Sequence, residues 1–262
     1  MSRELPKQKL VTVPEIQCVR RSPPADPKLI YPFGRFSEQE YLATLVSKRV
    51  IIVGPAGYLQ GKNLGKWIDS FDIVVRINHA IPILLPEDYG SRTDVLYHIL
   101  SHRGVDDANK KLVTRDEVEE WQKNGLKWLV SSHGPISERV KKMGPIIDSA
   151  FPWACVHHVF ATRIKQQIGQ KSPNTGITAI MHLLSSKLRS LHVVGFDFYR
   201  SGVYSGYGDV KQGEDAKAVN DRWHNIDAQL SFMKRIALRD NRLIIDDVLK
   251  AVLNDDQPSS NQ

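Results

Sequence analysis

The sequence predicts an α/β fold, with one Rossmann-like, doubly wound and mostly parallel sheet that forms a single domain. Short apolar segments alternate with amphipathic ones along the chain, and a glycine-rich turn follows the first apolar segment. No internal repeat interrupts this alternation. Strands that alternate with helices are typical of a parallel sheet that helices cover on both faces.

Seven apolar segments are expected to be the buried strands of this sheet. In chain order they span residues 49–53, 72–77, 93–98, 126–131, 155–160, 191–196 and 242–245. Amphipathic spacing predicts helices between them, one ending near Asp69 and others over residues 114–123, 175–187 and 215–238. In such a sheet the ligand lies beyond the carboxyl ends of the strands, so the turns there are the candidates for a site.

The two ends of the chain differ from this alternating core. Six prolines within residues 1–35 predict an irregular leader, because proline interrupts helices. Residues 254–262 are polar, which predicts a frayed tail. The single domain is therefore expected to occupy residues 36–253.

Composition narrows the classes of partner and of compartment. The 262 residues include 36 Lys and Arg against 29 Asp and Glu, a net charge of +7 that attracts anions. The cations are scattered and not interleaved with aromatic residues as in a strand-binding groove, so we expect no nucleic-acid partner and at most peripheral membrane contact. No apolar run approaches the ~20 residues of a membrane span, and two cysteines, Cys18 and Cys155, make no disulfide framework. A cytoplasmic location is expected.

The turn after the first strand is rich in glycine without matching a common nucleotide motif. The spacing of Gly54, Gly57 and Gly61 is not that of the dinucleotide fingerprint, and Asn63 stands where a P-loop has Ser or Thr. Glycines between a strand and a helix let backbone N–H groups approach a phosphate, although a purely structural tight turn explains them equally well. Arg76, with Asn78, ends the second strand beside this turn, where the pair can bond phosphate and ribose or base.

Residues 49–98 resemble the large sialyl-motif of the eukaryotic sialyltransferase family. The positions in register with that motif are Val53, Gly54, Gly57, Leu59, Gly61, Gly65, Ile68, Asp69, Asp72, Val74, Arg76, Asn78, Gly90, Arg92 and Thr93. The resemblance implies a GT-A-like variant of the Rossmann fold and a CMP-sugar donor. It also implies that Gly54, Ala56, Gly57 and Asn78 hold cytidine and phosphate, although Pro55 replaces the asparagine of the family.

A second segment, 173–176, reads Pro-Asn-Thr-Gly and opens an amphipathic helix. We interpret Thr175 as the N-cap, because N–H groups at a helix start attract an anion such as a sugar carboxylate; capping of a core helix explains the pattern equally well. With Gly195-Phe196 as its closing pair, the segment resembles the small sialyl-motif of the family. This implies donor binding by Asn174, which replaces the usual serine, and by Thr175 and Gly176.

Two further segments resemble the third and the very small motifs. Residues 204–209 resemble the third motif, with Gly206 in place of its histidine, so Tyr204 or Tyr207 is expected to bond the departing phosphate. His224 follows Gly206 by eighteen residues, and Gln229 stands where the family's very small motif closes with Glu. A lone histidine is more often structural, but this spacing implies that His224 is the catalytic base.

The other histidines carry weaker signals. His133 lies in a loop after the fourth strand, and we expect it, with Arg76, to contact substrate. His157 and His158 are adjacent in a predicted strand and so point to opposite faces, which excludes a shared metal. No Asp-x-Asp pair is present to carry a divalent ion on a diphosphate. We therefore expect no metal and no cofactor.

The resemblance implies inverting, metal-independent transfer of sialic acid or the related sugar Kdo from a CMP-sugar donor to a hydroxyl of a glycan or glycolipid acceptor. Oligomeric state stays open. The two cysteines of the family motifs are absent, since Arg49 stands at the first and residues 185–188 offer no thiol. These departures, with Pro55, Gly206 and Gln229, support one alternative, an inactive nucleotide- or glycan-binding module that retains the fold. A basic nucleic-acid-binding Rossmann domain is the other.

Overall fold

A computed structural model describes residues 38–101, 112–134, 137–169, 171–204, 207 and 224–255. The chain divides into two compact units, Met1–Pro32 and Phe33–Gln262, and every described residue belongs to the second. The predicted leader therefore lies outside the described residues, as does all but the start of the predicted polar tail.

Seven parallel strands form one sheet in the order β5-β4-β3-β2-β1-β6-β7. Their bounds are β1 Arg49–Val53, β2 Ile73–Ile77, β3 Val95–His98, β4 Trp128–Ser131, β5 Trp153–Cys155, β6 Ser190–Val194 and β7 Leu243–Ile245. This confirms the predicted parallel α/β sheet. The chain runs from β1 outward to β5 and then returns to the other side of β1, so the order reverses between β1 and β6, where the carboxyl ends form a ligand-binding position.

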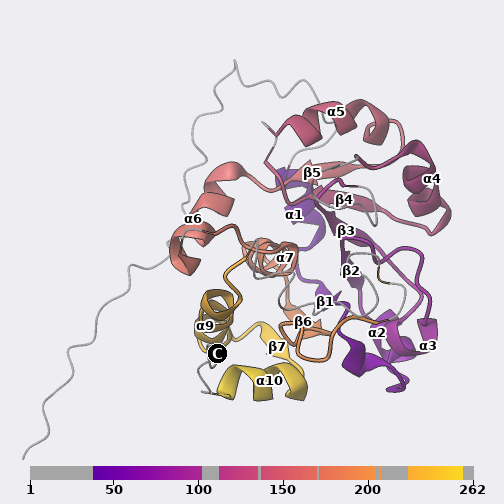
Figure 1. Ribbon diagram of the computed structural model, residues 1–262. Coiled ribbons are helices and arrows are strands. Elements are labelled where there is room, and N and C mark those ends of the chain that lie inside the picture. The colour runs from indigo at the N-terminus through magenta and orange to yellow at the C-terminus, as the bar shows by residue number, and fades with distance from the viewer. Residues whose placement is uncertain are drawn as a thin grey trace, which may run out of the picture. The chain divides into compact units, whose positions relative to one another are not determined.

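Helices cover both faces of the sheet (Figure 1). One face carries α1 Glu38–Thr44, α6 His158–Ile168, α7 Thr175–Leu184, α9 Ile226–Ala237 and α10 Asp247–Asn254. The other carries the short 3-10 helix η1 Gly57–Leu59, α2 Gly65–Asp69, α3 Pro86–Tyr89, α4 Arg115–Lys123 and α5 Glu138–Ile147. The sheet is thus doubly wound, as predicted.

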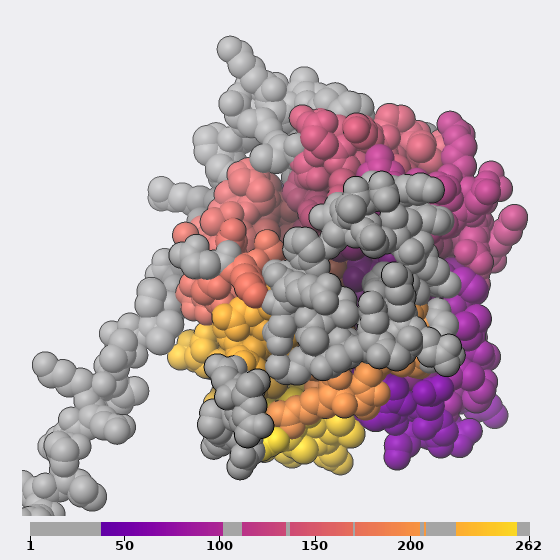
Figure 2. Space-filling view, in the orientation of Figure 1, coloured from indigo at the N-terminus to yellow at the C-terminus, as the bar shows by residue number. Residues whose placement is uncertain are grey.

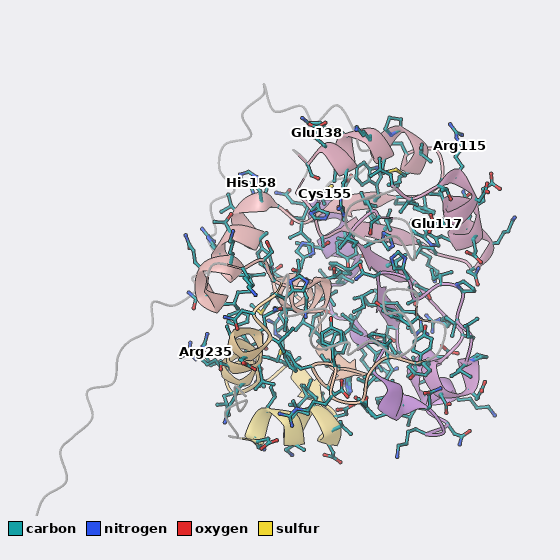
Figure 3. The ribbon with its side chains drawn as sticks, in the orientation of Figure 1. Arg115, Glu117, Glu138, Cys155, His158 and Arg235 are labelled. Atoms are coloured by element: carbon teal, nitrogen blue, oxygen red, sulfur yellow. The ribbon has the colours of Figure 1, made fainter. Side chains whose placement is uncertain are left out.

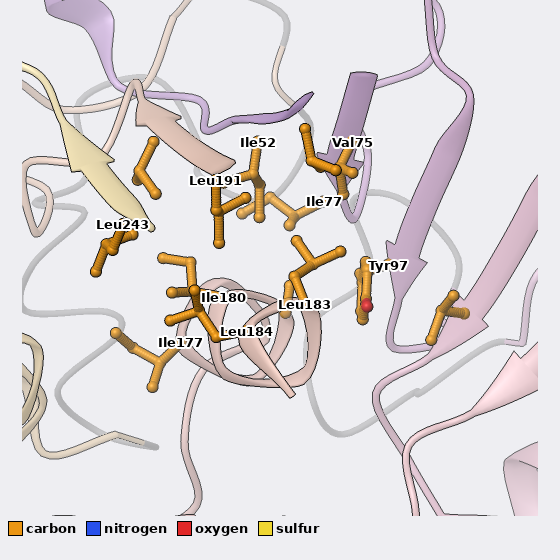
Figure 4. Packing of buried hydrophobic residues seen from close by; sticks show 14 of the residues in the cluster. Ile52, Val75, Ile77, Tyr97, Ile177, Ile180, Leu183, Leu184, Leu191 and Leu243 are labelled. Atoms are coloured by element: carbon orange, nitrogen blue, oxygen red, sulfur yellow. The ribbon is translucent and has the colours of Figure 1, made fainter. Parts of the chain in front are cut away.

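The largest core cluster lies between the sheet and α7 (Figure 4). Ile180 and Leu183 of α7 face Ile52 of β1 and Leu191 of β6, and all four are almost fully buried. Alternate buried residues of β1 to β6 belong to clusters on opposite faces, which is the period-two pattern of a sheet buried on both sides. Burial of each such side chain contributes about 1.5–3 kcal/mol to the free energy of unfolding. Burial around α7 therefore holds the helix start, and with it the predicted small motif, at the β1–β6 edge.

The prediction of a strand over residues 155–160 is wrong beyond Cys155. β5 ends there, and His158 begins α6, close to Cys155 in the structure (Figure 3). His157 caps α6, because its Nδ1 atom accepts the N–H of Val159. The two imidazoles therefore do not point to opposite faces; their ring centroids lie 4.4 Å apart. A short apolar run does not distinguish a strand from a helix start.

The longer amphipathic helices agree with the prediction, whereas several helices with short or broken apolar patterns were not predicted. Residues 114–123 are a helix as predicted, because Thr114 and Glu117 form a capping box. The predicted helix over 215–238 is present from Ile226 onward, and residues 208–223 lie outside the described part of the chain. Within the described ranges, five α-helices were not predicted, namely α1, α3, α5, α6 and α10. Four-to-eleven-residue helices give short or broken apolar patterns, and α5 even contains a proline.

Candidate active site

The first turn after β1 is joined to the loop after β6 by backbone hydrogen bonds. The N–H groups of Gly54, Ala56 and Gly57 donate to the carbonyls of Val194 (2.8 Å), Gly195 (3.1 Å) and Gly202 (3.2 Å) in that order. In the space-filling view the orange surface, to which the loop after β6 belongs, lies against the purple surface, to which the turn after β1 belongs (Figure 2). These three N–H groups are used within the protein. The free phosphate cradle inferred from the glycines is therefore not formed by them.

The glycines at this junction serve the close approach of two backbones. A Cβ atom on Gly54 would lie 2.2 Å from the carbonyl oxygen of Gly195. Gly195 has a φ of 75°, and a Cβ there would lie 2.5 Å from the carbonyl oxygen of Gly54. Contacts this short exclude any side chain, so both positions require glycine. The structure favours the structural interpretation of Gly54.

Asn78 is the predicted donor-binding residue whose geometry best fits a ligand. It follows β2 in the left-handed region, with a φ of 46°, a conformation that asparagine tolerates better than most residues. Its N–H donates to the carbonyl of Tyr97 at 2.7 Å, which holds the backbone in place. Its Oδ1 atom is buried and accepts no hydrogen bond from the described residues. Buried acceptors are normally satisfied, so this oxygen suits a donor group of a ligand.

Arg76 is buried beneath the site and 2% exposed. Its Nε atom donates to the carbonyl of Arg92 and the hydroxyl of Thr93, each at 3.0 Å. Its NH2 group donates to the carbonyls of Tyr89 (2.7 Å) and Gly90 (3.1 Å). The guanidinium therefore holds the turn that leads into β3. This geometry does not support the expected substrate contact and makes Arg76 a structural residue.

The start of α7 differs from its prediction by one residue. Asn174, not Thr175, is the N-cap, because the Asn174 Oδ1 atom accepts the N–H of Ile177 at 2.8 Å. Thr175 and Gly176 are then the first helical residues, whose N–H groups have no acceptor within the helix and suit an anion. A Cβ atom on Gly176 would lie 2.6 Å from the Phe196 ring, so this glycine admits the phenylalanine of the closing Gly-Phe pair.

His224 lies directly before α9 and not within a helix as predicted, since Asn225 is the N-cap of α9. Its Nδ1 atom lies 2.8 Å from the carbonyl oxygen of Ser172. A carbonyl only accepts, so Nδ1 carries the proton, and Nε2 of the neutral ring then has the lone pair. The Ser172 carbonyl thus fixes the orientation of the ring, and in its neutral form Nε2 is the nitrogen that can accept a proton. This is the arrangement that a general base requires.

Gln229 joins the two segments that carry His224 and Asn174. Its side chain is fully buried on α9, and its Oε1 atom accepts the N–H of Asn174 at 2.9 Å. Ser172 and Asn174 are thus both held from the beginning of α9. By sequence alone Gln229 is only a departure from the glutamate of the motif, and its contact across 55 residues of sequence could not be predicted from the pattern.

The two tyrosines of the third motif are buried next to the first turn. The N–H of Tyr204 donates to the carbonyl of Pro55 at 3.0 Å, and the Tyr207 hydroxyl donates to the carbonyl of Ile77 at 3.3 Å. Tyr207 therefore reaches the residue before Asn78. Gly206 lies outside the described residues. The expected phosphate contact of either tyrosine stays a prediction.

His133 follows β4, and its N–H donates to the hydroxyl of Ser131 at 3.1 Å. Strands β3 and β2 lie between β4 and β1 in the sheet. The structure therefore does not bring His133 to the edge between β1 and β6 with the other candidates, and its substrate contact stays a prediction.

A part-buried link that the sequence analysis did not predict joins three segments at the same edge. The Tyr58 hydroxyl donates to the carboxylate of Asp246, the N-cap of α10, and accepts the N–H of Gly195 at 2.7 Å. Burial raises the pKa of Asp246 above its ordinary value. This link holds η1, the loop after β6 and α10 together. Its two side chains lie 188 positions apart, and no local pattern points to their pairing.

Among the described residues, no three His, Cys, Asp or Glu side chains gather as a metal site requires, and no helix is long and apolar enough to cross a membrane. The expected cytoplasmic location and the expected lack of a cofactor stay predictions.

The model of glycosyltransferase family 29 (sialyltransferase) matches residues 32–238. The chain belongs to this family. It is therefore a CMP-sugar-dependent glycosyltransferase, as the motifs predicted. A type 2 lactosamine alpha-2,3-sialyltransferase of Homo sapiens is 24% identical over 247 residues, which cover 80% of this chain and 72% of that one. A CMP-N-acetylneuraminate-beta-1,4-galactoside alpha-2,3-sialyltransferase of Homo sapiens is 48% identical over 52 residues, 20% of this chain and 14% of that one.

Solved sialyltransferase structures are similar at low sequence identity. The monofunctional alpha-2,3-sialyltransferase Cst-I from Campylobacter jejuni superposes with a TM-score of 0.49 at 13% identity, over 78% of each chain. A mammalian sialyltransferase in complex with Gal-beta-1-3GalNAc-ortho-nitrophenol gives 0.44 at 17% identity, over 80% of this chain and 78% of that one.

Proposed function

We propose that this family member transfers sialic acid, or the related sugar Kdo, from its CMP-sugar to a hydroxyl of a glycan or glycolipid, with inversion and without a metal. The observation that carries the proposal is the bond between His224 Nδ1 and the Ser172 carbonyl beside the start of α7. It aligns a proton acceptor with a helix terminus suited to an anionic sugar. Both belong to motifs of one family.

The reaction proceeds by direct displacement. The acceptor oxygen attacks the anomeric carbon, and its proton passes to Nε2 of His224. The bond from the anomeric carbon to the phosphate oxygen breaks, and its electron pair leaves with CMP. Attack and departure on opposite faces of the ring invert the anomeric configuration. A base of this kind contributes about 10²- to 10⁴-fold to the rate.

Donor recognition is assigned to three groups at the same edge of the sheet. The buried Oδ1 atom of Asn78 accepts from a donor group of the nucleotide. The N–H groups of Thr175 and Gly176 bind the sugar carboxylate at the start of α7. Tyr204 or Tyr207 bonds the departing phosphate. A donor with one phosphate lacks the diphosphate that usually recruits a divalent ion, which supports transfer without metal.

The names of two relatives indicate which sugar acceptors to test first. The two relatives of Homo sapiens are named for lactosamine and for a beta-1,4-galactoside. Oligosaccharides that end in galactose are therefore the first acceptors to test for this chain.

The test of the donor class is a thermal titration of the purified protein with CMP, CDP, UDP and NAD, in magnesium and then in EDTA. A ligand that binds only the folded state raises the thermal midpoint by mass action. We expect a rise with CMP that EDTA does not change. A rise with UDP or NAD in place of CMP would contradict the proposal. A rise with CMP but no turnover of CMP-sialic acid or CMP-Kdo would favour the inactive module.

A further inference from the structure

We propose that Gln229 is the positioning residue of this site. It fixes the segment that orients His224 and, as a neutral amide, keeps a negative charge away from that base. The inference rests on the proposed function. It assigns a role to Gln229, which by sequence is a departure from the glutamate of the very small motif.

The contacts of Gln229 use both ends of its amide. Oε1 accepts the N–H of Asn174 at 2.9 Å, and Nε2 donates to the carbonyl of Asn225 at 3.4 Å. The side chain is completely buried, so water does not compete for either bond. A buried amide is stable only when its donor and its acceptor are both satisfied, and here both ends have partners.

Gln229 and His224 hold one short segment from the same helix start. His224 Nδ1 binds the carbonyl of Ser172, and Gln229 Oε1 binds the N–H of Asn174, two residues further along. Asn174 in turn caps α7 through its own side chain. The base and the anion-binding helix start are therefore set relative to each other by two bonds. Loss of the Gln229 bond leaves the part-buried Asn174 N–H without its acceptor and the Ser172 carbonyl less well placed.

An amide at position 229, in place of a carboxylate, affects the proton affinity of the His224 imidazole. A carboxylate at position 229 would still accept from Asn174, but it would have no hydrogen for the Asn225 carbonyl. Its charge would lie within roughly 10 Å of the His224 ring, because the two anchor points are two residues apart. A negative charge at that distance favours the protonated imidazole. Lys171 and Asp227, which are charged residues of the two described segments, are exposed and are the same in both variants.

The experiment compares Gln229→Glu and Gln229→Leu with the wild-type chain. The rate of CMP release from CMP-sialic acid is measured from pH 5 to pH 9, together with the CMP dissociation constant. For Gln229→Glu we expect the acidic limb of the kcat/KM profile to move up by roughly 0.5–1 pH unit. For Gln229→Leu we expect kcat to fall about tenfold or more while CMP affinity changes less than about threefold.

A matched control carries the same charge change far from the site. Gln122 is an exposed amide on α4 that donates to the carbonyl of Ala150. Gln122→Glu should leave the pH profile and kcat as they are. A shift of equal size in Gln122→Glu would assign the effect to net charge and overturn the proposal. So would a wild-type kcat in Gln229→Leu, or an unmoved profile in Gln229→Glu.

A second readout does not depend on turnover or on the leucine variant folding. NMR of the ¹⁵N-histidine-labelled protein reports the titration midpoint of the His224 ring in wild type, Gln229→Glu and His224→Ala, the last serving to assign the signal. We expect a higher midpoint in Gln229→Glu. An unchanged midpoint overturns the inference. A raised midpoint in a protein that turns over no CMP-sugar supports the inference while the proposed function fails.

Discussion

At the scale of single residues, hydrogen bonding separates side chains that hold the fold from those that remain candidates for ligand binding. Arg76 and Asn78 are both in register with the same motif and end the same strand. The Nε and NH2 groups of Arg76 donate to partners within the protein, whereas the Oδ1 atom of Asn78 is a buried acceptor without a partner among the described residues. Burial and hydrogen bonding, not motif membership, distinguish the two roles.

Asn78→Gly should weaken CMP binding about tenfold, because it removes the amide while glycine keeps the left-handed backbone. Isothermal titration with CMP measures the loss. Asn78→Ala adds backbone strain of about 1 kcal/mol, so its thermal midpoint should be lower than that of the glycine variant. Unchanged CMP affinity in Asn78→Gly would remove Asn78 from the donor site.

Arg76→Ala should lower the free energy of unfolding by about 3 kcal/mol or more. It leaves three carbonyls and the Thr93 hydroxyl without their buried cationic donor. Urea unfolding measures the change. CMP affinity of the folded fraction should stay within about threefold. A large loss of CMP affinity with wild-type stability would restore Arg76 to the binding site.

At the scale of elements, polar contacts in the interior join described helices that lie far apart in the sequence. Local sequence patterns do not predict these contacts. Glu38 on α1 bonds His182 on α7 at 2.9 Å and accepts the N–H of His157 at 3.1 Å. His182 in turn bonds the Tyr97 hydroxyl of β3 at 2.9 Å. The network connects α1, a helix that was not predicted, to the helix whose start forms the candidate site.

Glu38→Gln should make the protein less stable at pH 7 and less sensitive to acid. Burial opposes ionisation of Glu38, but the hydrogen bonds and charges of His182 and His157 together outweigh it, so the pKa of Glu38 lies below its ordinary value of 4.5. The folded state binds this proton less readily than the unfolded state. The stabilisation is therefore complete above about pH 4.5 and is lost as the pH falls through the folded-state pKa.

The expected loss is about 1 kcal/mol at pH 7, measured by urea unfolding at pH 7 and at steps below pH 4.5. Glu40→Gln removes an exposed carboxylate from the same helix and is the matched control. An equal acid dependence in wild type and Glu38→Gln would contradict this account of α1.

At the scale of the whole molecule, the order of strands and helices could be predicted because alternation of apolar segments is a local property. Six of the predicted strands are present and the fifth overlaps its prediction only at Cys155, while the doubly wound sheet follows from connection rules. The site was only partly predictable. Motif spacing pointed to Asn78 and His224 as candidates, whereas the bond from Gln229 to Asn174 and that from Tyr58 to Asp246 join distant segments that no local pattern connects. The first turn shows the converse, since its glycines suggested a free phosphate cradle and instead permit two backbones to cross.

The central claim is that His224 is the base of a CMP-sugar transferase. The most direct measurement is the rate of CMP release from CMP-sialic acid and CMP-Kdo, with galactose-terminated acceptors, by wild type and His224→Ala. We expect His224→Ala to lose roughly a hundredfold or more in kcat with CMP affinity nearly unchanged. His192→Gln, a histidine on β6 packed against Phe71, is the control and should keep its rate. Full activity in His224→Ala would contradict the account.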